Sequence, residues 1–162
     1  MEGIFAATPP LECLKCLISE CAFQDDQRIM VSDISRAYFN AKCDPANPTF
    51  VALPTEDKGH HTTCGLLKKH MYGTQAAADG WQQEYSSTMV ALGFKQGVAS
   101  HCVFWHEARS LVASVHGDDF TCSGARSQLQ WFEQALREKY ELTVGARLGP
   151  GKDDDKEGLV FN

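Results

Sequence analysis

The chain has 162 residues, of which 43% are hydrophobic and 22% are charged, an ordinary mixture for one globular domain with its own core. No apolar run approaches the roughly 18 residues of a membrane span, and the N-terminus lacks the basic and apolar regions of a signal peptide. Seven cysteines, an odd number, favour reduced thiols in an intracellular protein, and the net charge of -6 argues mildly against nucleic-acid binding.

The first half of the chain predicts one helix and several short strands. An amphipathic helix is expected to start at Thr8, as its N-cap, and to carry apolar residues at helical spacing as far as Cys21. Strands are then predicted at residues 29–34, 49–53 and 64–67. Because side chains alternate along a strand, Asp33 ends a face that is otherwise apolar.

The second half predicts a long helix, a β-hairpin and a final helix. The long helix covers residues 76–92 and ends at Gly93, a typical glycine stop. Strands are predicted at residues 101–106, 111–115 and 120–122. The last two strands form a hairpin whose turn holds Asp118 and Asp119. A capping box of a serine and a glutamine opens the final helix, residues 127–140.

The order of these elements predicts an α+β domain in which helices back an antiparallel sheet, in the ferredoxin-like split βαβ manner. We expect residues 1–144 to form this domain. Residues 145–162 are rich in glycine and aspartate and are predicted to be a tail or a truncated next element.

Three aspartates are the candidate catalytic residues. Asp in a turn is ordinarily explained by solvation and local hydrogen bonds. If the strands that carry Asp33 and the pair Asp118 and Asp119 are neighbours, however, three carboxylates converge on one edge of the sheet. Mg²⁺ prefers such oxygen ligands, and two ions together assist phosphoryl transfer. The other acidic stretches, residues 25–26 and 153–155, are predicted to be solvated loops.

Six segments, in the same order, resemble copia-type retrotransposon reverse transcriptases and span about residues 5 to 144. Residues 33–40 read DISRAYFN where the family has DVKTAFLN, and residues 115–119 read VHGDD where the family has YVDD. Residues 66–81 resemble the family segment LKKSLYG that is followed by a tryptophan. The other three segments are LGF at 92–94, HCVF at 101–104 and YEL at 140–142.

The resemblance implies a right-hand polymerase palm with a remnant of the fingers, part of a retrotransposon Pol polyprotein. Its activity would be RNA-directed DNA polymerisation. Asp33, Asp118 and Asp119 would be the catalytic residues and the ligands of two Mg²⁺ ions, with Mn²⁺ as a substitute. The implied partners are an RNA or DNA template-primer and deoxynucleoside triphosphates, in a cytoplasmic particle or the nucleus.

The resemblance also assigns residues to the substrates. The nucleotide-binding candidates are Ile34, Tyr38 and Gln75, and the nucleic-acid contacts are His116, Gly117, Lys68 and Lys69. Tyr38 would be the steric gate that excludes a ribose 2′-OH. The chain departs from the family at two of these places. His116 and Gly117 replace a Tyr-Val pair, which removes a primer-contacting tyrosine, and Gln75 lies one position before the family glutamine.

Several parts of the family enzyme have no counterpart in this sequence. They are the basic fingers strands before the first aspartate, the thumb, and the RNase H and integrase regions. We expect these parts on neighbouring segments of a longer protein, and we expect residues 1–162 alone to polymerise poorly, since nucleotide positioning supplies much of the catalysis.

Two other functions are compatible with the sequence. One is a catalytically inactive palm remnant that serves as a nucleic-acid-binding or interaction module. The other is a zinc-binding module, since Cys13 and Cys16 have CxxC spacing and His60, His61 and Cys64 lie downstream. Cys13 and Cys16 fall inside a predicted amphipathic helix, however, which favours partly buried thiols over a zinc knuckle.

Overall fold

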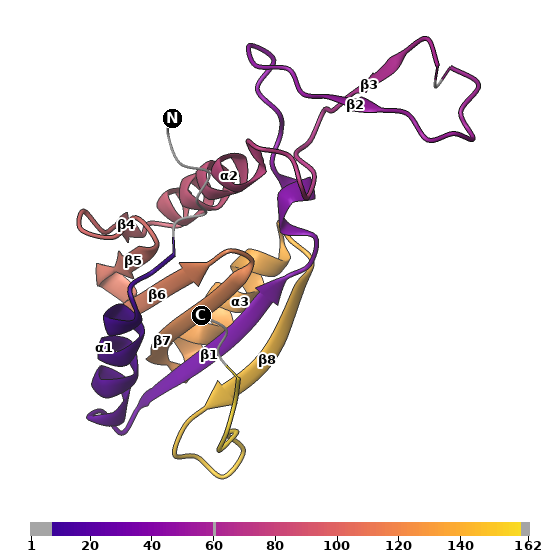
Figure 1. Cartoon of the computed structure of the whole chain (residues 1–162). Helices are drawn as coiled ribbons and strands as arrows, with labels where there is room; N and C mark the ends of the chain where they lie inside the picture. Colours follow the sequence, from indigo (N-terminus) through magenta and orange to yellow (C-terminus); the bar gives the residue numbers. More distant parts are fainter. Residues whose placement is uncertain (1–7, 60, 160–162) are drawn as a thin grey trace.

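The computed structural model describes residues 8–59 and 61–159, which form a six-stranded antiparallel sheet with helices on both faces and a separate two-stranded ribbon (Figure 1). The helices are α1 (Leu11–Ala22), α2 (Ala77–Ala91) and α3 (Arg126–Arg137), with short 3-10 helices η1 (Ala37–Asn40) and η2 (Glu107–Arg109). The strands are β1 (Gln27–Ile34), β2 (Phe50–Ala52), β3 (Cys64–Leu66), β4 (Lys95–Gln96), β5 (Val103–His106), β6 (Leu111–His116), β7 (Asp119–Ala125) and β8 (Leu142–Leu148).

The strand order in the sheet is β4-β5-β6-β7-β1-β8, while β2 and β3 form the ribbon, which projects away from the sheet in Figure 1. The predicted α+β fold, an antiparallel sheet backed by helices, is confirmed. None of the helices in the described part of the chain is long and apolar enough to cross a membrane.

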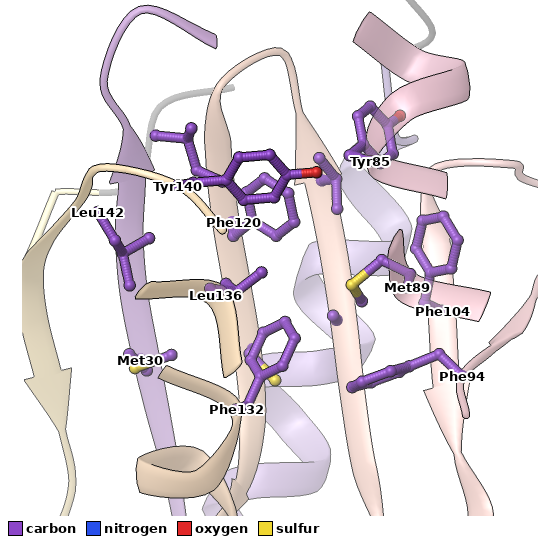
Figure 2. Packing of buried hydrophobic residues seen from close by; sticks show 14 of the residues in the cluster. Met30, Tyr85, Met89, Phe94, Phe104, Phe120, Phe132, Leu136, Tyr140 and Leu142 are labelled. Atoms are coloured by element: carbon purple, nitrogen blue, oxygen red, sulfur yellow. The ribbon is translucent and has the colours of Figure 1, made fainter. Parts of the chain in front are cut away.

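The two faces of the sheet are packed differently because alternate residues of each strand point to opposite sides. On one face, Met30 and Phe120 of the central strands pack against α2 and α3 in the main core (Figure 2). On the other face, α1 places Leu17 against Ile29 and Val31 in a smaller cluster. Asp33 follows Ile29 and Val31 on this second face.

The ends of the helices differ from the sequence prediction. The N-cap of α1 is Pro10 and that of α3 is Ala125, and neither helix has a side-chain cap hydrogen bond. The predicted cap at Thr8 and the predicted capping box are therefore wrong, and tertiary packing of an apolar face holds these helices instead. Gly93 has a φ of +95°, which confirms the predicted glycine stop after α2.

The sequence boundary at residue 144 falls inside a strand. Residues 145–148 complete β8, in which Leu148 pairs with Ile29 and Ala146 pairs with Val31 of β1. The register shifts between Val31 and Ser32, so the ladder accommodates an irregularity in the strand. The composition, rich in glycine and aspartate, predicted a tail or a truncated next element from residue 145, but the edge of β1 supplies backbone partners for the rest of this strand.

The two acidic stretches, residues 25–26 and 153–155, differ in their surroundings. Asp25 and Asp26 are exposed in a turn, as predicted. The prediction of a solvated loop is wrong for Asp154, whose side chain is only 4% exposed and forms ion pairs with Arg28 and Arg126. Arg28 and Arg126 lie far from Asp154 in the sequence, so no local sequence pattern predicts these ion pairs.

Candidate active site

Four residues form a row across four strands at one end of the sheet. Asp119 of β7 pairs with His116 of β6 on one side and with Asp33 of β1 on the other, and Asp33 in turn pairs with Thr143 of β8. The row lies on the face opposite the main core, because the adjacent Phe120 is buried in that core. β1 and β7 are therefore neighbours, and their two aspartates lie opposite each other.

Asp118 is held just beyond this row by a tight turn. Gly117 and Asp118 form the two-residue loop between the ladder partners His116 and Asp119. Of these loop residues only Gly117 has a positive φ, +61°, the pattern of a type II′ hairpin turn. The backbone N–H of Ile34 donates to the carbonyl oxygen of Asp118 at 2.9 Å, so the turn is tied to the end of β1.

The carboxylates of the row disfavour one another's charge. The pKa of Asp33 is raised, first by burial and then by the charge of Asp118. The pKa of Asp119 is raised by burial and by both other aspartates, while His116 lowers it. Among the described residues, none of these three carboxylates forms an ion pair with a lysine or arginine.

The oxygen donors of this edge suit a hard divalent cation. Burial is the main reason that the pKa values of Asp33 and Asp119 are raised, and a cation would relieve the repulsion from neighbouring aspartates that adds to it. Within residues 8–59 and 61–159, no three His, Cys, Asp or Glu side chains are gathered closely enough to hold a metal ion as they stand. The fold makes Asp33 and Asp119 ladder partners and places Asp118 in the adjacent turn, but the described carboxylates do not form a closed metal site as they stand.

A depression of about 290 Å³ opens beside the two strand aspartates. Asp33, Asp119 and Thr143 line it together with Leu159, which follows the loop after β8. Polar groups of the row and apolar surface thus share one hollow, a usual composition for a ligand site.

The chain after Asp33 turns sharply toward Tyr38. Arg36 has a positive φ of +54°, unusual for a residue with a side chain, and its guanidinium pairs with Glu141 at 2.5 Å. The turn leads into η1, where the rings of Tyr38 and Tyr72 lie 4.4 Å apart. The pKa of Tyr72 is raised by burial and then by the charge of Asp118, so this tyrosine contacts the predicted gate and is within electrostatic reach of the acids.

Sequence reasoning missed Tyr72 as a site residue. The signal was present, since it is the aromatic residue directly before Gly73 in the segment that resembles the family. The side chain of Ile34 is fully buried in the core, and its backbone N–H donates to the carbonyl oxygen of Asp118. Any nucleotide contact of Ile34 therefore does not involve its side chain.

The remaining predicted contacts, Lys68, Lys69 and Gln75, do not belong to the paired strands of the acidic row. Lys68 and Lys69 are exposed on the segment that joins the ribbon to α2, where Lys69 forms a backbone bridge with Lys42. Gln75 is exposed in the turn before α2. These residues come from one connecting segment, whereas the aspartates come from paired strands.

The cysteines of the alternative zinc site are widely separated. Cys13 and Cys16 lie within α1, as the helical pattern predicted, whereas Cys64 is on β3. In Figure 1, α1 and the ribbon lie at opposite ends of the molecule. His60, a further ligand of that alternative, lies outside the described residues.

Comparison with known proteins identifies one family. A family model described as reverse transcriptase (RNA-dependent DNA polymerase) matches residues 2–149, a range that includes all three aspartates and reaches the end of β8. A comparison with curated proteins gave no match.

Proposed function

Because the chain belongs to the reverse transcriptase (RNA-dependent DNA polymerase) family, we propose that it is the palm of a copia-type retrotransposon enzyme, with α1 as the remnant of its fingers. In this proposal the palm extends past the predicted boundary at residue 144, to the end of β8 at Leu148. We propose that the chain works within a Pol polyprotein inside the cell, joined to the fingers, thumb, RNase H and integrase regions.

The observation that carries this proposal is the pairing of Asp33 with Asp119, next to Asp118 in the turn, with no lysine or arginine of the described chain paired to them. In the proposed site these three carboxylates hold two Mg²⁺ ions, which supply Lewis acidity to the attacking and leaving oxygens of nucleotidyl transfer. The negative charge that the carboxylates concentrate at this edge is then an advantage, because it attracts a divalent cation.

The protein groups around the acids bind and orient the substrates. Tyr38 is the proposed steric gate, braced by its ring contact with Tyr72, and fills the space that a ribose 2′-OH needs. Lys68 and Lys69 are exposed cations suited to phosphates of the template-primer. Gln75, one position from the family glutamine, is the proposed contact to the incoming nucleotide.

The turn itself is proposed to face the end of the primer. In the resembling family a Tyr-Val pair stands where this chain has His116 and Gly117. A valine is strained at a positive φ, so Gly117 lets the turn form without that strain. His116 offers a ring nitrogen in place of a tyrosine hydroxyl.

Mn²⁺ titration of the folded chain, by calorimetry and by the electron paramagnetic resonance of free Mn²⁺, tests the site. We expect weak binding, because substrate phosphates normally complete the coordination shell. Asp118→Asn should weaken it at least about tenfold, since one charged ligand is lost. The matched control is Asp153→Asn, which removes an exposed acid outside the site and should leave binding unchanged. Identical affinity in the wild type and in Asp33→Asn/Asp118→Asn would refute the shared site.

A further inference from the structure

The turn that carries Asp118 is anchored from a second direction, by α2. The indole N–H of Trp81 donates to the carbonyl oxygen of Gly117 at 2.8 Å. The next carbonyl oxygen, of Asp118, accepts from the N–H of Ile34 at 2.9 Å. Two successive peptide groups of the turn are thus held by two different elements, one on each side.

Trp81 is itself firmly placed. Its side chain is 1% exposed, and its ring packs edge-on against Tyr85 and Tyr140, with centroids 5.6 and 5.4 Å away. The hydroxyl of Tyr140 lies 2.7 Å from the hydroxyl of Thr88, which is one helical turn beyond Tyr85 on α2. The indole therefore cannot follow the turn if the turn moves, and the hydrogen bond fixes the turn relative to the body of the domain.

Gly117 makes such an anchor necessary. Glycine is the residue with the most backbone freedom, and a Cβ placed at this position would meet nothing within 4 Å. No side-chain packing therefore restrains this residue of the loop. The direction of the Gly117 carbonyl sets the peptide plane that leads into Asp118, so the bond from Trp81 also restrains the backbone from which that carboxylate extends.

We infer that Trp81 is a positioning residue: its indole N–H holds the Gly117 peptide so that the Asp118 carboxylate faces those of Asp33 and Asp119. This inference rests on the proposed function, since it assigns to α2 the task of orienting a metal ligand. Trp81 does not touch the substrate or an ion. Ligand groups must be held to within about half an ångström for full effect, so a loosened turn weakens the site without removing any ligand.

The test replaces Trp81 by β-(3-benzothienyl)alanine, an isostere with sulfur in place of the indole N–H, by site-specific incorporation into the whole chain. Mn²⁺ affinity is measured as for the wild type. We expect it to fall about three- to tenfold, the effect of losing one ordinary hydrogen bond. Trp81→Phe, which also removes the donor, should show at least the same loss, and tryptophan incorporated by the same route should restore wild-type affinity.

Tyr85→Phe is the matched control for packing. Tyr85 lies one turn further along α2, contacts the Trp81 ring, and loses only a hydroxyl that bonds to the Cys102 thiol. It should leave Mn²⁺ affinity unchanged. Wild-type affinity in both folded Trp81 variants overturns the inference while leaving the proposed function intact. If instead the wild type binds no Mn²⁺, or binds it equally in Asp118→Asn, the proposed function fails first.

Discussion

The chain has two groups of aspartates, and their charges meet opposite surroundings in the fold. Asp33, Asp118 and Asp119 lie at one end of the sheet with no lysine or arginine paired to them among the described residues. The group at residues 153–155 lies in the loop after β8, where the carboxylate of Asp154 is enclosed by cations and backbone donors.

The second group is neutralised within the protein. Asp154 pairs with Arg28 at 2.6 Å and with Arg126 at 2.5 Å, and accepts the N–H of Gly151 at 2.8 Å. Burial alone would raise the pKa of Asp154, but the Gly151 hydrogen bond and the two arginines lower it. This carboxylate ties the loop to the start of β1 and of α3, which is a structural role.

A structural acid and a candidate metal ligand differ in how the charge of the carboxylate is balanced. A carboxylate whose charge is balanced inside the chain has a lowered pKa, as at Asp154, and does not need an external ion. At Asp33 and Asp119 the pKa values rise, first through burial and then through the charges of neighbouring aspartates, and a cation from solution would relieve that repulsion. The sequence alone does not distinguish the two groups, since each contains adjacent aspartates.

The largest expected effect is on polymerase activity, which should fall when the first group of aspartates is changed but not when the second group is changed. In an enzyme form that extends primers, either residues 1–162 or a longer chain that contains them, Asp118→Asn should slow primer extension on an RNA template by at least about a thousandfold. A catalytic metal ion contributes several kcal/mol of transition-state stabilisation, which this change disables. Asp153→Asn should extend primers like the wild type, and an equal loss in the two variants would remove the distinction.

A smaller effect concerns Tyr38, the proposed steric gate on the turn that follows Asp33. Tyr38→Val should raise ribonucleotide incorporation relative to deoxynucleotides by about tenfold, or roughly 1.4 kcal/mol, because the ring no longer fills the space of the 2′-OH. The measurement is kcat/KM for matched ribo- and deoxynucleotides in the same active enzyme. Metal dependence should not change, since no ligand is touched. An unchanged ratio would leave the proposed role of the aspartates standing but would refute the assignment of Tyr38 as the steric gate.

The smallest effects are on stability and depend on pH in opposite senses. The pKa of Asp119 is higher in the fold than the ordinary 3.8, so its ionisation destabilises the fold as pH rises through the folded value. The pKa of Asp154 is lower than 3.8, so its ionisation stabilises the fold above 3.8, and this contribution is lost as pH falls through the folded value. Asp119→Asn should therefore raise the thermal midpoint by a few degrees at pH 7, and Asp154→Asn should lower it by several.

Both differences should shrink as the pH is lowered toward 3.8 and below, where the wild-type carboxyls become protonated. Thermal unfolding followed by circular dichroism, without divalent ions, at a series of pH values from 8 downward gives the measurement. Asp153→Asn again serves as the control, since its side chain is exposed. Shifts of the same sign for Asp119→Asn and Asp154→Asn at pH 7 would contradict the comparison.

Much of the fold was predictable because it follows local rules. Alternating apolar residues located β1 and the hairpin of β6 and β7, and the apolar stripe of α2 with Gly93 behind it located the long helix. The placement of Asp33 at the end of an apolar face also followed from strand periodicity alone. Helix starts were predicted less well, since Pro10 and Ala125 cap their helices without any side-chain bond.

Side-chain periodicity and turn chemistry act over a few residues, so the sequence alone predicts most of the elements, the position of Asp33 at a strand end and the pair Asp118 and Asp119 at a hairpin turn. Tertiary structure alone decided which charges are neutralised and which backbone groups are held. Arg28 and Arg126 reach Asp154 across the fold, and Trp81 reaches Gly117 from another element. β8 likewise forms because the edge of β1 is free to pair with it. These contacts join residues distant in the sequence, and their energies depend on burial and geometry that exist only once the sheet has formed.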